Sequence, residues 1–265
     1  MKHMIITGGT RGIGFGLVCE FLRSGFRVTF TGTSDTTVNH AVDELSLTFN
    51  TENFRGVVCD VRETSDLVTL WEFSTSIFGQ VDIWFNNAGV SNRNTSFTNL
   101  ESDEFVRVVD VNIKGLMVAT HLAYNKMTSQ GHGAIYNMGG LGSDGRMIKG
   151  LIPYGMSKRA VQYFTRGFAR EIKGGDIICG LVLPGMVLTD LLLDPIRKDP
   201  AGTKRSARIF RFLAEEVETV ASFIVPRVIE NKTNGVVISY LTTRKIIGNF
   251  FTRIFRDTDI VSKHL

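Results

Sequence analysis

Cysteine and proline are scarce in this sequence, and long apolar runs are missing from it. Only 5 prolines and 3 cysteines occur among the 265 residues. Cys19, Cys59 and Cys179 are far apart and odd in number, which is typical of reduced thiols rather than of a disulfide framework or a metal site. We therefore expect no metal, and we expect the chain to work in a reducing compartment.

The missing apolar runs bear on membranes. No run approaches the roughly 18–20 residues that a transmembrane helix needs. The N-terminal stretch MKHMIITGG leads directly into a strand and a glycine turn, which leaves no room for a signal peptide. We expect a soluble protein of the cytoplasm or another reducing compartment. Such a protein could contact a membrane only at the membrane surface.

A nucleic-acid-binding module is also missing, because no basic stripe is interleaved with aromatic residues. The net charge is +4, from 30 Lys or Arg against 26 Asp or Glu. Residues 196–265 carry 13 of the former against 7 of the latter, or +6, so the rest of the chain is slightly acidic. Such a basic region is either a solvated face or a surface for an anionic substrate, an acidic partner or a lipid headgroup.

Apolar strand-like runs alternate along the chain with segments of helical periodicity. Strands are expected at residues 4–7, 27–32, 55–61, 81–89, 133–139, 176–185 and 235–241. Helices are expected at residues 13–24, 36–49, 66–78, 101–130, 154–173 and 214–230. This alternation predicts a doubly wound α/β fold, with a parallel sheet covered by helices on both faces. We expect one domain over residues 1–265.

The first expected strand runs into a glycine-rich turn, TGGTRGIG, at residues 7–14. Glycines at 8, 12 and 14 permit a tight turn, a close approach of the backbone to a phosphate, and close packing of helix on strand. The N-terminus of the following helix would then hold the anion. Because the turn comes directly after the first strand, it predicts a dinucleotide site.

The end of the second strand distinguishes the two nicotinamide cofactors. An acidic residue there would bond the ribose 2′-hydroxyl and repel a 2′-phosphate. Gly32 stands at this place instead, followed by Thr33 and Ser34, and Arg11 in the glycine turn could offer a guanidinium to a phosphate. We predict NADPH rather than NADH, unless Asp35 turns inward.

Tyr154 and Lys158 are four residues apart in a helical segment, so their side chains would lie one turn apart on one face. A cation there favours phenolate and could move the phenol pKa from about 10 toward neutral. Such a group can give a proton to a carbonyl oxygen or take one from an alcohol. A Tyr and a Lys at this spacing also occur by chance on many helices.

Two asparagine motifs accompany this pair. Residues 86–89, NNAG, end the fourth expected strand, where small residues let the backbone approach a cofactor and an amide can lock neighbouring strands. Asn112 lies inside an expected helix, where asparagine is mildly disfavoured. We predict a kink that directs a carbonyl at ordered water, although a helical asparagine can also simply satisfy a buried carbonyl.

Together these motifs resemble the short-chain dehydrogenase/reductase family: TGGTRGIG, CDV at 59–61, NNAG, Asn112, YGMSK at 154–158 and PGMVLTD at 184–190. The resemblance implies a Rossmann sheet of about seven strands. It also implies that Tyr154 is the acid/base, that Lys158 lowers its pKa and holds the nicotinamide ribose, and that Asn112 completes a proton relay. The cofactor-binding residues implied are Gly8, Thr10, Arg11, Gly12, Ile13, Gly14, Thr33, Ser34, Asp60, Val61, Asn87, Ala88, Gly89, Tyr154, Lys158, Pro184, Gly185, Val187 and Thr189.

One departure from the family pattern is informative. The family usually has a Ser-Ser pair about 13 residues before the tyrosine, and the second serine holds the substrate carbonyl. In residues 137–145, NMGGLGSDG, glycines occupy the serine positions. Either the oxyanion donor is lost, or Ser143 takes its role. This segment is similar to the branch of the family that reduces the C7 formyl group of chlorophyll b to hydroxymethyl, as are PGMVLTDLL and FLAEEVETVASFIVPRV.

We therefore expect an NADPH-dependent carbonyl reductase of the chlorophyll b reductase type. A generic ketone, aldehyde or 3-oxoacyl reductase is the alternative within the family, and a non-catalytic NADP-binding sensor or scaffold is the alternative of another class. Residues 186–213 are expected to cover a large, apolar carbonyl substrate, although they could form an ordinary amphipathic helix. Residues 242–265 are expected to extend the C-terminus, and the chain to form a homo-dimer or homo-tetramer.

Overall fold

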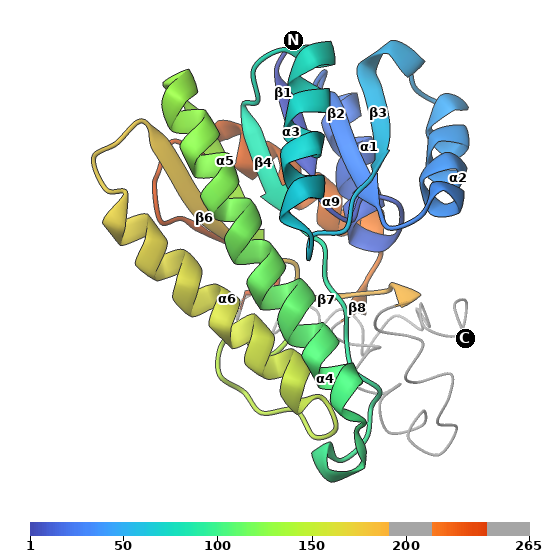
Figure 1. The fold of residues 1–265 in the computed structure, drawn as a ribbon, viewed down its shortest axis with the longest axis vertical. Coiled ribbons are helices and arrows are strands. Elements are labelled where there is room, and N and C mark those ends of the chain that lie inside the picture. Colours follow the sequence, from blue (N-terminus) through green and yellow to red (C-terminus); the bar gives the residue numbers. More distant parts are fainter. Residues whose placement is uncertain (191–213, 243–265) are drawn as a thin grey trace, which may run out of the picture.

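A sheet of seven parallel strands runs through the computed structural model, which describes residues 1–190 and 214–242 (Figure 1). Its order is β3-β2-β1-β4-β5-β6-β9. This confirms the predicted doubly wound fold, and every strand of the sheet overlaps a predicted run. The strands are β1 (His3–Ile6), β2 (Arg27–Gly32), β3 (Phe54–Val58), β4 (Ile83–Asn86), β5 (Gly133–Met138), β6 (Ile177–Leu183) and β9 (Val237–Ser239).

Helices cover both faces of the sheet. One face packs against α1 (Gly12–Arg23), α2 (Asp35–Ser46) and α9 (Val217–Glu230). The other packs against α3 (Thr64–Phe78), α5 (Leu116–Gln130) and α6 (Ile152–Glu171). Short helix α4 (Ser102–Val109) leads toward α5, which runs beside α6 (Figure 1). Two 3₁₀ turns, η1 (Thr51–Asn53) and η2 (Phe97–Asn99), lie in connections.

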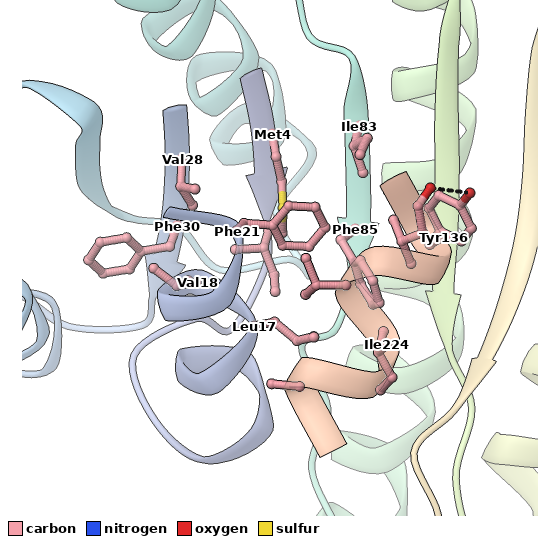
Figure 2. Close-up of a cluster of buried hydrophobic side chains, with 14 of the residues drawn as sticks. Met4, Leu17, Val18, Phe21, Val28, Phe30, Ile83, Phe85, Tyr136 and Ile224 are labelled. Atoms are coloured by element: carbon pink, nitrogen blue, oxygen red, sulfur yellow. Dashed lines mark hydrogen bonds between the residues drawn. The ribbon is translucent and has the colours of Figure 1, made fainter. Parts of the chain in front are cut away.

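The core on the α1 side fixes the helix that follows the glycine turn. Leu17 and Phe21 of α1 are fully buried with Met4 of β1 and Phe30 of β2, and Ile224 of α9 packs in the same cluster (Figure 2). Burying each such side chain is worth about 1.5–3 kcal/mol. The N-terminal end of α1 is therefore held against the carboxyl ends of β1 and β2.

A network of uncharged polar side chains ties the middle of the sheet to the other helical layer. Asn86 at the end of β4 accepts from the Trp84 indole at 2.7 Å and donates to Thr120 of α5 at 2.9 Å and to Asn137 of β5 at 2.8 Å. Asn137 donates in turn to Thr165 of α6 at 3.0 Å. Because buried polar groups are costly unless bonded, this network specifies how β4, β5, α5 and α6 sit together.

The structure corrects the predicted helices at two places. The segment predicted as one helix over 101–130 contains a π-helical turn, η3 (Asp110–Gly115), between α4 and α5. Such turns are a recognised cause of helix kinks. The helix predicted over 214–230 begins only at Val217, because Ala214 and Glu215 form β8, which pairs in parallel with β7 (Met186–Val187).

Most of the predicted substrate cover and nearly all of the C-terminal extension, beyond residues 190 and 242, lie outside the described residues. That the chain forms one domain stays a prediction. Among the helices that the structure describes, none is both long and apolar enough to cross a bilayer. Cys19, Cys59 and Cys179 are free thiols, two of them buried.

Candidate active site

A cavity of about 450 Å³ opens where β1 lies between β2 and β4, the place at which the strand order reverses. In doubly wound folds, ligands bind at such a switch point beyond the carboxyl ends of the strands. The glycine turn, the ends of β2 to β4 and Thr189 form its walls. The cavity therefore stands where the sequence predicts a dinucleotide.

The glycine turn fits a phosphate. Gly8 and Gly12 have φ of +68° and +55°, which side chains rarely adopt. A Cβ on Gly14 would lie 2.0 Å from the carbonyl oxygen of Gly8, so the turn closes only with glycine there. Arg11 caps α1 without a side-chain hydrogen bond to its first turn. The first N–H groups of α1 thus stand at the cavity wall, where an anion would satisfy them.

Most of the predicted cofactor-binding residues line this cavity. They are Gly8, Thr10, Arg11, Gly12, Ile13, Gly14, Thr33, Asp60, Val61, Asn87, Ala88, Gly89 and Thr189. The cavity wall does not include Ser34, Tyr154, Lys158, Pro184, Gly185 or Val187. The roles of all these residues remain predictions.

Sequence reasoning missed several residues of the wall. Arg62 is the most notable of them, because it forms a salt bridge with Asp60 and donates from Nε to Oδ2 at 2.9 Å. These bonds lower the pKa of Asp60. The signal was available, since Arg62 follows Val61 in the same turn after β3. The other missed residues are Thr31, Cys59, Val90, Arg107, Val111 and Asp190.

Asn87 locks the ends of β1 and β4 together, as its motif predicts for an amide. Its side chain donates to the carbonyl oxygens of Thr7 at 3.1 Å and Gly8 at 2.7 Å. Gly89, two residues further along the chain, lies in the cavity wall close to Asn112 and Lys158, which are predicted to be catalytic. A Cβ there would lie 3.3 Å from Oδ1 of Asn112 and 3.4 Å from Nζ of Lys158.

Tyr154 and Lys158 lie on one face of α6, with the Lys158 Nζ 5.8 Å from the centre of the Tyr154 ring. Nζ donates to the carbonyl oxygen of Met138 at 3.1 Å. Burial raises the pKa of Tyr154 to about 12 and lowers the pKa of Lys158 to about 8. Loss of water opposes charge on both groups. That Lys158 lowers the pKa of the phenol stays a prediction.

Asn112 is buried inside the π-helical turn, where its side chain bonds to the loop after β4 and to α6. Oδ1 accepts from the Val90 N–H at 2.8 Å, and Nδ2 donates to the Val90 carbonyl and to Oγ of Ser157, both at 2.9 Å. The side chain thus ties the loop after β4 to α6. A relay through this residue would have to use its main-chain carbonyl.

Two residues that sequence reasoning missed hold the main chain of Tyr154. Oδ1 of buried Asn92 accepts from the Tyr154 N–H at 3.3 Å, while Nδ2 donates to the Gly150 carbonyl at 2.9 Å. Oγ of Ser157 donates to the Tyr154 carbonyl at 2.7 Å. Nothing in the sequence pattern marks Asn92, because its partners lie about 60 residues away in the chain.

Ser143 is buried, and its hydroxyl is bonded to main chain on both sides. Oγ accepts from the Gly140 N–H at 3.0 Å and donates to the Lys158 carbonyl at 3.2 Å. The hydroxyl proton thus points at a backbone oxygen. Of the two alternatives left by the sequence, these partners favour loss of the side-chain oxyanion donor.

Comparison with known proteins agrees with this geometry. The model of the short chain dehydrogenase family matches residues 2–199. Chlorophyll(ide) b reductase NOL, chloroplastic, of Oryza sativa subsp. japonica is 35% identical over 261 residues, which cover 95% of this chain and 75% of that protein. A 3alpha-hydroxysteroid dehydrogenase of Mediterraneibacter gnavus is 34% identical over 191 residues, which cover 72% of this chain and 76% of that protein.

Solved structures are similar along most of the chain. ElxO with NADP bound has a TM-score of 0.80 and 26% identity, and covers 90% of this chain and 96% of its own. Levodione reductase has a TM-score of 0.80 at 21% identity, and covers 92% of this chain and 97% of its own. The similarity to levodione reductase supports the fold alone.

Proposed function

Since the chain belongs to the short-chain dehydrogenase/reductase family and is an NAD(P)-dependent oxidoreductase, we propose that it is an NADPH-dependent carbonyl reductase. We propose further that it reduces the C7 formyl group of chlorophyll(ide) b to hydroxymethyl. The proposal of a reductase rests on one observation, that the Tyr154 phenol lies one helical turn from Lys158 beside the cavity at the glycine turn. The substrate rests on similarity to chlorophyll(ide) b reductases over 95% of the chain.

The choice of NADPH is supported by the wall at the end of β2. A Cβ on Gly32 would lie 2.6 Å from the Thr10 methyl and 3.0 Å from Oγ1 of Thr37, so an acidic side chain there would clash. Asp35 is exposed and does not line the cavity, whereas Arg11 does. A guanidinium in the cavity wall favours a 2′-phosphate. ElxO, one of the similar structures, has NADP bound.

The protein's own part in the reaction is to place a carbonyl and supply one proton. A bound reduced nicotinamide would supply the hydride for the carbonyl carbon. Tyr154 gives its hydroxyl proton to the carbonyl oxygen as negative charge builds there. Lys158 places a positive charge near the phenolate that remains, and Asn112 fixes the loop against which both groups lie.

We propose that reduction is the working direction. Burial raises the pKa of Tyr154, which keeps the phenol protonated and supports its role as a proton donor.

Within the family, a steroid ketone is the second candidate substrate. The observation that supports a steroid ketone is the 34% identity to a 3alpha-hydroxysteroid dehydrogenase, which is limited to 191 residues. The identity to chlorophyll(ide) b reductase extends over 261 residues and so takes in the C-terminal part of the chain. That difference in extent favours the formyl substrate.

We also propose that the chain forms a homo-dimer or homo-tetramer through α5 and α6. An apolar groove of about 650 Å³ lies on these helices, with Met117, Met156 and Phe164 in its wall. Tyr163 is 83% exposed in the same groove, and the space above Gly167 is open. The exposed Tyr163 side chain and the open space above Gly167 lie one helical turn apart. In a two-fold contact, Tyr163 of each copy would therefore fill the space above Gly167 of the other. Light scattering would then report a smaller assembly for Gly167→Arg than for the wild type.

The test of the proposed function is a substrate panel with NADPH. Chlorophyllide b, chlorophyll b, a steroid ketone and a 3-oxoacyl thioester are each incubated with the protein, and products are identified by mass. A gain of two hydrogens on the b-type pigments, with slower turnover of the other carbonyls, is the expected result. If NADPH binds but none of the four carbonyls is reduced, the proposed substrates are wrong and the alternative of an NADP-binding sensor gains support.

A further inference from the structure

The Tyr154 hydroxyl lies against bare main chain at Gly140. A Cβ on Gly140 would stand 2.8 Å from Oη of Tyr154, and 3.3 Å and 3.4 Å from Cγ and Cε of Lys158. A Cβ contact under 3.0 Å essentially never occurs, so one of the two groups would have to move. The phenol therefore occupies the space that any side chain at position 140 would need.

The segment that carries Gly140 cannot easily withdraw from α6. A Cβ on Gly139 would lie 2.5 Å from Cδ2 of Leu183, so the segment is packed from its other side. At Gly142, φ is +96° and a Cβ would lie 2.6 Å from Cα of Gly155, so backbone meets backbone one residue after the tyrosine. With both neighbours closed, a clash at Gly140 would be relieved by movement of the phenol.

Ser143 fastens this segment to the turn of α6 that carries Lys158. Its hydroxyl joins the Gly140 N–H to the Lys158 carbonyl, and its own carbonyl accepts from Arg159 at 2.9 Å. One buried side chain thus fixes how far Gly140 lies from the helix. The distance between the bare main chain and the phenol depends on this connection.

We propose that Gly140 is a positioning residue, whose lack of a side chain sets the place of the Tyr154 hydroxyl and leaves it as the side-chain donor to the carbonyl oxygen. Serine at position 140 would displace the phenol instead of adding a second donor. The effect of Gly140 on catalysis rests on the proposed reductase function, whereas its effect on the position of the phenol does not.

The first test compares Gly140→Ala and Gly140→Ser with the wild type on a carbonyl that the wild type reduces. We expect kcat to fall by about 10²-fold, the order that a misplacement of 1 Å costs. The Kd for NADPH, measured by calorimetry, should stay within about twofold, because Gly140 does not line the cavity. Gly155→Ala is the matched control, since its Cβ would lie an ordinary 4.0 Å from Cα of Gly142. A Gly140→Ser variant with wild-type or higher kcat would overturn the proposal.

The second test needs no activity and so separates this inference from the proposed function. Tyr154→Phe removes the atom that a Cβ at position 140 would meet. Gly140→Ala should therefore lower the Tm less in the Tyr154→Phe background than in the wild type, which is a coupling that a double-mutant cycle measures. Equal losses in both backgrounds, including failure of both variants to fold, would contradict the proposal whatever the enzyme reduces.

Discussion

Lys158 should cost the folded protein stability, so replacing it should stabilise the chain while impairing catalysis. The side chain is 4% exposed, and burial lowers its pKa from 10.5 to about 8. Each pH unit of such a fall corresponds to about 1.4 kcal/mol, so keeping the ammonium charged at pH 7 costs about 3 kcal/mol. Replacing Lys158 also removes its hydrogen bond to the Met138 carbonyl, which offsets about half of the gain.

Lys158→Met keeps the length of the side chain and removes the charge. At pH 7 we expect a net gain of about 1–2 kcal/mol, or a rise in Tm of roughly 2–8 °C for a chain of this size. The folded pKa lies below the unfolded one, so the unfolded chain holds the proton more tightly between pH 8 and 10.5. The cost is therefore full below about pH 8 and disappears as the pH rises toward 10.5.

The assay is urea denaturation of both proteins at pH 7 and at intervals up to pH 10.5. The advantage of Lys158→Met should be largest at pH 7 and shrink across that range. Lys173→Met serves as the control, because Lys173 is exposed and its loss should change stability by less than about 0.5 kcal/mol. The reasoning would be refuted if Lys158→Met were less stable than the wild type at pH 7, or if the difference in stability between the two proteins did not change with pH.

Four further outcomes are expected. Tyr154→Phe should lower kcat by about 10²–10⁴-fold while calorimetry finds NADPH affinity unchanged, because only the proton donor is lost. The kcat/KM for reduction should be level below about pH 8 and fall above it in pH-rate measurements, as Lys158 loses its proton. Arg11→Ala should weaken NADPH more than NADH in calorimetry, and equal losses would place the 2′-phosphate elsewhere. Ser143→Ala should cost about 1–3 kcal/mol in urea denaturation, since it leaves the Gly140 N–H unbonded. A loss of about 10²–10³ in kcat at unchanged stability would instead make Ser143 the oxyanion donor.

The fold was predictable because its signals are local. Parallel strands buried on both faces read as continuous apolar runs, and β1, with all four residues buried, is one of them. The interruption of the helix at Asn112 was also predictable, because asparagine suits helices poorly. How far the interruption extends was not predictable, since it depends on a tertiary contact: Gly115 packs on the main chain of Val61, where a Cβ would lie 2.9 Å from the carbonyl oxygen.

The candidate site was predictable only in part. Residue type and spacing identified Tyr154 and Lys158, because helical geometry alone brings them to one face. Asn92 and the partners of Ser143 depend on contacts of loops with α6 that no periodicity encodes. Spacing reveals a neighbouring charge but not the removal of water, so the rise in the pKa of Tyr154 that burial causes could not be predicted.

The polar groups that support Tyr154 and Lys158 suggest why an expensive buried cation is kept. Asn92, Ser157 and Ser143 bond the main chain of these two residues with an amide and two hydroxyls, and burial accounts for the lowered pKa of Lys158. A carboxylate beside Lys158 would raise its pKa and remove the cost of burying it. It would also neutralise the cation before any negative charge appears on Tyr154. Amides and hydroxyls satisfy their own bonds and leave that charge available, so the interaction of the Lys158 ammonium with the phenolate forms only as the proton leaves. An interaction that strengthens during the reaction lowers the barrier, whereas one already present in the resting protein does not.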